Sequence, residues 1–130
     1  MRRLLLLLVI GLLSVTTLTA CSSSTTHTVN PDQAKSMIDQ GAGVLDVRTP
    51  EEFAQGHLVG AINIDVENPD FQTKVASLQK DATWVVYCHS GRRAALAISE
   101  MSTMGFTDLS NAGGFADLAN AGIPWAQGSN

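Results

Sequence analysis

TWVVYCHSGRR, residues 83–93, is the stretch of this 130-residue chain from which its fold can be derived. Residues 84–87 are an apolar run whose length is typical of a buried strand. Residues 92–104 are typical of an amphipathic helix, because their apolar side chains recur at intervals of three and four, at Ala94, Ala97, Ile98 and Met101. A cysteine and a short polar turn therefore join a predicted strand to a predicted helix.

The turn after Cys88 has a chemical consequence. The backbone N–H groups of residues 89–93 are expected to point inward, and the following helix adds the positive end of its dipole, so the turn forms a site for an anion. Cys88 lies at the edge of this site, which favours its thiolate over its thiol. A buried structural cysteine is the alternative, but such a cysteine does not require the positive charges of Arg92 and Arg93 behind it.

Two motifs connect the chain with a known family. YCHSGRRA, residues 87–94, resembles the active-site loop of rhodanese-type sulfurtransferases, and LDVRTPEEFAQGHLVGAINID, residues 45–65, is similar to the other signature of that family. The motifs have the order and the approximate separation that the family shows, and the resemblance covers about residues 29–127. It implies a single α/β domain with a mostly parallel central sheet and helices on both faces.

The resemblance also implies a reaction. A small anionic donor such as thiosulfate would leave its outer sulfur on Cys88 as a persulfide. Cyanide or a thiol would then accept that sulfur, in a covalent cycle that uses no metal and no organic cofactor. Arg93 matches the arginine of the family's CxxGxR pattern. Binding of the donor and of the persulfide is expected from the loop residues His89, Ser90, Gly91, Arg92 and Arg93.

Three other functions are compatible with a reactive cysteine. Cysteine phosphatases and the related arsenate reductases use a C-x5-R loop, whereas the sixth position after Cys88 is Ala94. A thiol–disulfide oxidoreductase requires a second cysteine nearby, and none follows Cys88 in the sequence. A persulfide carrier that delivers sulfur to a partner protein without turnover remains an alternative, since the presence of Cys88 favours catalysis without excluding a carrier.

The rest of the chain predicts strands that alternate with helices, which favours a mostly parallel sheet. Strands are expected at residues 44–47, 61–64, 84–87 and 106–110, and helices at residues 30–40, 49–55, 68–78, 92–104 and 115–121. Because ligands bind at the carboxyl ends of such strands, Asp46, Arg48 and Cys88 should share one edge of the sheet. Arg48 is expected to have a structural role, in an ion pair with Asp46, Glu51 or Glu52.

The N-terminal residues 1–20 have the features of an export signal, with two arginines before an apolar run too short to span a bilayer. LTAC, residues 18–21, resembles the lipobox of bacterial lipoproteins, so Cys21 is expected to carry acyl chains such as palmitate. Residues 21–28 would then form a Ser/Thr-rich tether, and residues 29–127 the rhodanese-like domain. The expected location is the cell envelope, on the extracytoplasmic side of a membrane; a plain secretory signal is the alternative.

The charge of the chain bears on its partners. Removal of residues 1–20 takes away two arginines and no acidic residue, so the formal charge changes from −4 to −6. An acidic domain of this kind is a poor candidate for binding nucleic acid. With lipid on Cys21, Cys88 would be the single free thiol, which in an exported protein indicates a reactive group.

Overall fold

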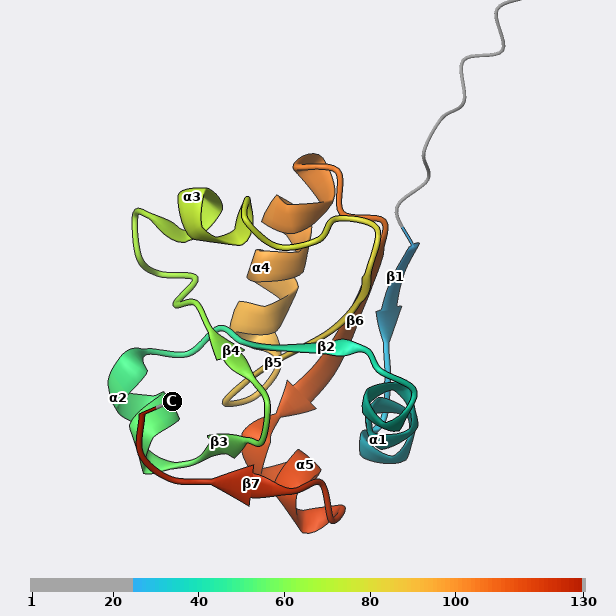
Figure 1. Ribbon diagram of the computed structural model, residues 1–130, viewed down its shortest axis with the longest axis vertical. Coiled ribbons are helices and arrows are strands. Elements are labelled where there is room, and N and C mark those ends of the chain that lie inside the picture. The colour runs from blue at the N-terminus through green and yellow to red at the C-terminus, as the bar shows by residue number, and fades with distance from the viewer. Residues whose placement is uncertain (1–24, 130) are drawn as a thin grey trace, which may run out of the picture.

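The computed structural model describes residues 25–129 of the chain (Figure 1). Its centre is a five-stranded sheet of order β1-β6-β5-β2-β4 in which every neighbouring pair is parallel. These strands are β1 (Thr25–Thr28), β2 (Gly43–Asp46), β4 (Ile62–Asn63), β5 (Thr83–Cys88) and β6 (Asp108–Gly114). A small antiparallel pair, β3 (His57–Leu58) and β7 (Trp125–Ala126), lies apart from that sheet. The predicted α/β fold with a mostly parallel sheet is confirmed.

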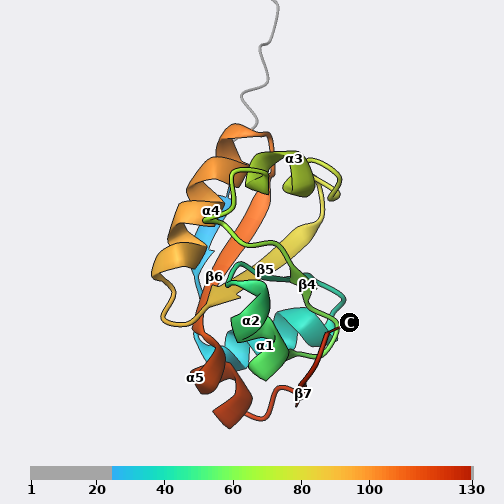
Figure 2. The ribbon, with the colours of Figure 1, turned by 90° about the vertical axis from the view of Figure 1, so that its left-hand side faces the viewer.

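Helices cover both faces of the sheet, as expected (Figures 1 and 2). They are α1 (Pro31–Asp39), α2 (Pro50–Gln55), α3 (Phe71–Val75), α4 (Arg92–Thr103) and α5 (Phe115–Asn120). One apolar cluster packs α3 and α4 on the sheet, and a second packs α1, α2 and α5 on the opposite face. Alternate residues of β5 enter the two clusters, so Cys88 faces α4 whereas its neighbour Tyr87 faces the other side.

Two helices begin with the capping boxes that their sequences encode. The Asn30 side chain accepts the Gln33 N–H, and the Gln33 side chain accepts the Asn30 N–H, at the start of α1. Thr49 and Glu52 make the same reciprocal pair at the start of α2. The second box fixes the position of the Glu52 carboxylate, which also contributes to the site described below.

The prediction of a tether over residues 21–28 is wrong for its second half. Residues 25–28 form β1, which pairs with β6 along its whole length, and the Thr25 N–H also donates to the Thr107 carbonyl. Without β1, the backbone groups along this edge of β6 would have no strand partner, and a threonine-rich segment suits strand pairing. The predicted signal peptide (residues 1–20) and lipidated Cys21 lie outside the described residues.

Strand β6 is longer than predicted. In its pairing with β5, Asn111 lies opposite Val86 and Gly114 lies opposite Cys88, and the register shifts between these two pairs. The sequence predicts a strand only to residue 110 and a loop over residues 111–115, but residues 111–114 form the end of a central strand beside Cys88. Helix α3 is shorter than predicted, because the Asn68 side chain accepts the Asp70 N–H in a turn before the helix. Within residues 25–129, no helix combines the length and apolarity needed to cross a bilayer.

Candidate active site

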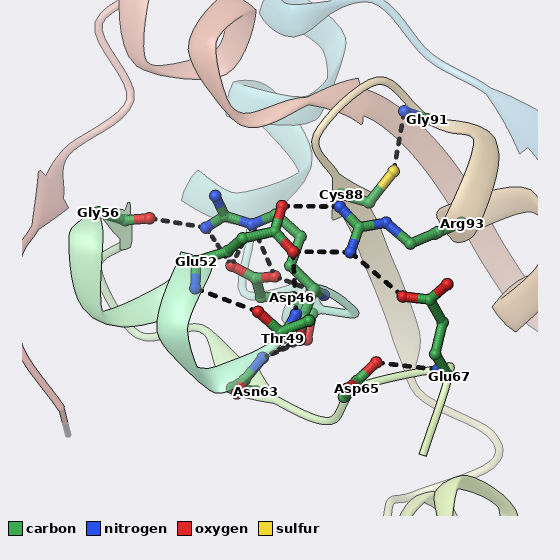
Figure 3. A network of polar contacts seen from close by, with 11 residues as sticks. Asp46, Thr49, Glu52, Gly56, Asn63, Asp65, Glu67, Cys88, Gly91 and Arg93 are labelled. Atoms are coloured by element: carbon green, nitrogen blue, oxygen red, sulfur yellow. Dashed lines mark hydrogen bonds and ion pairs between the residues drawn. The ribbon is translucent and has the colours of Figure 1, made fainter. Parts of the chain in front are cut away.

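Cys88 ends β5 and lies at the base of the turn that leads into α4. Its side chain is 1% exposed, and its Sγ accepts a hydrogen bond from the Gly91 N–H at 2.9 Å (Figure 3). The loop thus directs at least one backbone donor at the sulfur, as the sequence predicts. A sulfur anion at this position would be stabilised by that donor and by the N-terminus of α4.

The backbone at position 91 can be occupied only by a glycine. It adopts a left-handed conformation with φ +94°, and a Cβ there would lie 3.1 Å from the Gly113 Cα. The end of β6 holds it in place, because the Asn111 Nδ2 donates to the Gly91 carbonyl at 2.9 Å. The Asn111 Oδ1 in turn accepts the Gly113 N–H at 3.0 Å. The donor that faces Cys88 is therefore positioned by the neighbouring strand.

Gly114 supports the other half of the loop. A Cβ at Gly114 would collide with the carbonyl oxygen of His89, so the loop can approach β6 only at a glycine. Sequence analysis did not identify Asn111, Gly113 or Gly114 as site residues. The signal that could have found Gly113 and Gly114 is the Gly-Gly pair that follows the strand predicted at residues 106–110, since such a glycine marks close approach of another backbone segment.

Arg93 is already paired within the protein. Its guanidinium makes two hydrogen bonds of 2.7 Å to the Glu52 carboxylate, and Glu67 lies farther away, at 3.8 Å (Figure 3). The hydrogen bonds from Arg93 lower the pKa of Glu52 to about 2, and the same pairing raises the pKa of Arg93. Arg93 therefore joins the loop to α2, and its charge is largely compensated.

Arg92 differs from its neighbour. It is exposed at the first position of α4, and within residues 25–129 its side chain makes no hydrogen bond or ion pair. The sequence analysis predicts that both arginines bind the donor, and Arg93 is the one that matches the family's CxxGxR pattern. In the structure, Arg92 is the loop arginine whose positive charge is available to a ligand.

Arg48 forms the structural ion pair expected of it, and its partner is Asp46. Its Nη2 lies 2.6 Å from an Asp46 oxygen and donates to the Gly56 carbonyl, also at 2.6 Å. The guanidinium also lies over the ring of Phe115, with 4.8 Å to the ring centroid. Burial opposes the charge of Arg48, but the hydrogen bond and the attraction of Asp46 outweigh it and raise the pKa. Arg48 thereby holds the C-terminus of α2 beneath the loop.

His57, which lies within the motif of residues 45–65, is a packing residue. It is buried, its ring stacks on Phe53 with 3.7 Å between centroids, and its Nδ1 lies 2.9 Å from the Phe53 carbonyl oxygen. No group of three or more histidine, cysteine, aspartate or glutamate residues that could hold a metal ion occurs in the part of the chain that the structure describes.

Two cavities flank the loop. One has a volume of about 350 Å³ and is lined by Glu67, His89, Ser90, Arg92, Arg93 and Leu96. The other, of about 390 Å³, is lined by Arg48, Glu52, Gln55, Gly56, His89 and Phe115. His89 borders both cavities. Of the ion pair between Arg93 and Glu52, Arg93 lines the first cavity and Glu52 lines the second. The structure therefore brings four of the predicted loop residues to one cavity, with Cys88 and Gly91 buried beside it.

Comparison with known proteins places this arrangement in context. The sequence model of the rhodanese-like domain matches residues 30–121. The thiosulfate sulfurtransferase PspE of Escherichia coli is 41% identical over 70 residues, which cover 54% of this chain and 67% of that protein. The mitochondrial protein HIGH ARSENIC CONTENT 1 of Arabidopsis thaliana is 38% identical over 98 residues, or 68% of this chain, and the match spans only 58% of that relative. A solved structure of a rhodanese with anions from E. coli has a TM-score of 0.58 and 36% identity, over 68% of this chain and 100% of that one.

Proposed function

This chain belongs to the rhodanese-like domain family, and from that premise we propose that it is a sulfurtransferase that carries sulfur on Cys88. The donor is thiosulfate or a similar small anion, and the acceptor is cyanide or a thiol. The observation that carries the proposal is the Cys88 Sγ held 2.9 Å from the Gly91 N–H, at the base of a six-residue loop. A relative named thiosulfate sulfurtransferase supports it.

The cycle has two balanced steps. The Cys88 thiolate attacks the outer sulfur of thiosulfate, the S–S bond of the donor breaks, and sulfite leaves with the electron pair of that bond. The acceptor then attacks the terminal sulfur of the persulfide, and the electron pair of the new S–S bond returns to the Cys88 Sγ. The Gly91 N–H faces the sulfur that carries negative charge at the start and at the end of the cycle.

The two arginines of the loop have different tasks in this proposal. Arg92 attracts the anionic donor, because its charge is uncompensated among the described residues. Arg93 positions the loop through Glu52 and adds a weaker attraction, because a bidentate pair leaves little net charge. His89 and Ser90 line the cavity through which both substrates approach.

Intact mass spectrometry tests the proposal. In the full chain carrying Cys21→Ser, Cys88 is the only cysteine. Thiosulfate should add the mass of one sulfur atom, cyanide should remove it, and Cys88→Ser should abolish the gain while the protein stays folded. No gain on a thiol that alkylation shows to be free would overturn the proposal, and arsenate and a phosphate ester would then be assayed as substrates. A sulfur that a protein thiol removes but cyanide does not would assign a carrier.

We also propose that Cys21 carries lipid and anchors the domain to the extracytoplasmic side of a membrane. The support is the LTAC motif at residues 18–21 and the basic, apolar segment before it. Three residues separate Cys21 from β1, so the four residue steps from Cys21 to Thr25 span at most roughly 14 Å. Because β1 is parallel to β6 and β5, its beginning lies at the opposite end of the sheet from Cys88 (Figure 1). An anchor at this end directs the site away from the lipid surface.

A further inference from the structure

The cavity of about 350 Å³ beside the loop presents opposite charges to one ligand. Its wall contains Arg92, which has no charged partner within residues 25–129, and Glu67, which is only loosely paired. We propose that this cavity binds an amino-acid thiol, such as cysteine, through the carboxylate of the ligand at Arg92 and its ammonium group at Glu67. The inference rests on the proposed function and names the class of acceptor that takes sulfur from Cys88.

The backbone of Glu67 is fixed at the rim of the cavity, but its carboxylate makes no close ion pair with any described residue. Its own N–H donates to the Asp65 side chain at 2.9 Å, and the preceding Val66 N–H donates to the Val47 carbonyl at 3.2 Å. These bonds fix the backbone, while the side chain remains 65% exposed. The nearest guanidinium, Arg93, is 3.8 Å away and already makes two short bonds to Glu52 (Figure 3). The Glu67 carboxylate can therefore accept hydrogen bonds from a ligand cation.

The opposite wall comes from one face of α4. Arg92 and Leu96 are four residues apart on this helix, so their side chains are neighbours. Leu96 is 54% exposed and offers an apolar surface for the short carbon chain of an amino acid. The cavity volume lies near the lower end of the range of about 300–1,000 Å³ that is usual for small-molecule sites. Its size suits a single amino acid better than a long peptide.

Among acceptor thiols, the balance of charges favours one that carries both an ammonium and a carboxylate group. Glu52 compensates Arg93, and Glu67 adds one negative charge to the cavity that Arg92 lines, so these four side chains have no net charge. An acceptor thiol with a carboxylate but no ammonium group gains the attraction of the Arg92 guanidinium and is repelled by the Glu67 carboxylate. An amino acid places one charge against each. The cavity therefore discriminates among acceptors by the presence of both an ammonium and a carboxylate group.

The transfer step requires no additional reactant. The thiolate of the bound amino acid attacks the terminal sulfur of the Cys88 persulfide, and the S–S bond to Cys88 breaks. The electron pair of that bond stays on the Cys88 Sγ, and the product is the persulfide of the amino acid. The sulfur changes carrier, and no external oxidant or reductant is needed.

Three thiols allow the contributions of the ligand's ammonium and carboxylate groups to be measured separately. Cysteamine is cysteine without its carboxylate, and 3-mercaptopropionate is cysteine without its amine. The full chain carrying Cys21→Ser is loaded with sulfur from thiosulfate, and the rate of discharge by each thiol is measured by intact mass. The intrinsic reactivity of a thiol cancels when its rate with a variant is divided by its rate with the unmodified cavity.

Each variant should impair a different pair of thiols. Glu67→Gln should slow discharge by cysteine and cysteamine about fivefold relative to 3-mercaptopropionate, as expected for a partly exposed ion pair. Arg92→Gln should slow cysteine and 3-mercaptopropionate relative to cysteamine. Glu51→Gln removes the same charge from an exposed position that does not line the cavity, and should leave all three ratios unchanged. Equal changes for all three thiols in both cavity variants would overturn the inference.

Titration with L-serine distinguishes failure of this inference from failure of the proposed function. Serine has both charged groups of cysteine but no thiol, so it binds without reacting. In an NMR titration, chemical-shift changes confined to the cavity residues and abolished by Glu67→Gln would support the amino-acid site. If thiosulfate also loaded no sulfur, only the proposed function would fail. Normal loading and cyanide discharge, with no response to serine and no preference among thiols, would overturn the inference and leave the sulfurtransferase intact.

Discussion

At the scale of single residues, the pairing of Glu52 with Arg93 makes stability depend on pH. The hydrogen bonds from Arg93 lower the folded-state pKa of Glu52 from its usual 4.5 to about 2, so protonation favours the unfolded chain. The stabilisation is complete above about pH 4.5 and is lost as the pH falls towards about 2. We expect Glu52→Gln to lower the free energy of unfolding at pH 7 by about 1 kcal/mol, measured by chemical denaturation.

The difference between Glu52→Gln and the unmodified protein should shrink as the pH falls through that window. Glu51→Gln is the matched control, because Glu51 is exposed and the two short hydrogen bonds from Arg93 go to Glu52 instead. A deficit in Glu52→Gln of the same size at pH 7 and pH 2 would mean that the carboxylate charge is not the source of the stabilisation. The sequence shows the capping box that places Glu52, but the partner of its carboxylate lies 41 residues away.

At the scale of elements, local patterns predicted what local interactions determine. The apolar runs gave β2 and β5, and the spacing of apolar residues gave α4. The far end of β6 was missed because its residues, Asn-Ala-Gly-Gly, have low strand propensity and are held by pairing with β5 and by contact with the loop. The same contact explains why Asn111 and Gly114 were not recognised as part of the site. The Gly-Gly pair indicates that another backbone segment approaches closely, but the local sequence does not show that this segment is the loop after Cys88.

Gly114→Ala tests whether β6 shapes the loop around Cys88. The new Cβ would collide with the His89 carbonyl, so we expect at least a tenfold loss of sulfur transfer per folded molecule. Gly43→Ala is the control, because its Cβ would meet the Trp84 ring at the opposite end of β5. Overpacking of this kind destabilises by about 1–3 kcal/mol, and Gly43→Ala should lose stability but not activity per folded molecule. Full activity in Gly114→Ala would show that the contact is not needed.

At the scale of the whole molecule, the parallel sheet separates the chain's beginning from its chemistry. Thr25 of β1 and Thr83 of β5 both pair with Asp108 of β6, so the two strands begin at the same end of the sheet. Cys88 lies five residues beyond Thr83 along β5, which is roughly 17 Å at the usual rise per residue. The sequence predicted one edge for Cys88, Asp46 and Arg48 because parallel strands share their carboxyl ends. It did not predict that β1 joins the sheet, because an exposed strand of four polar residues has no apolar pattern.

This separation leads to a prediction for the anchored protein. Replacing Cys21 by serine should release the domain from the membrane fraction, while the Cys88 persulfide still forms with thiosulfate. In the anchored form, a membrane-impermeant labelling reagent should modify a cysteine introduced at exposed Ser90 faster than one introduced at exposed Thr26, because the proposed anchor would hold the beginning of β1 next to the lipid. Both cysteines should be labelled at similar rates in the released form. Faster labelling at residue 26 in the anchored form would place the site against the membrane and contradict the orientation derived from β1.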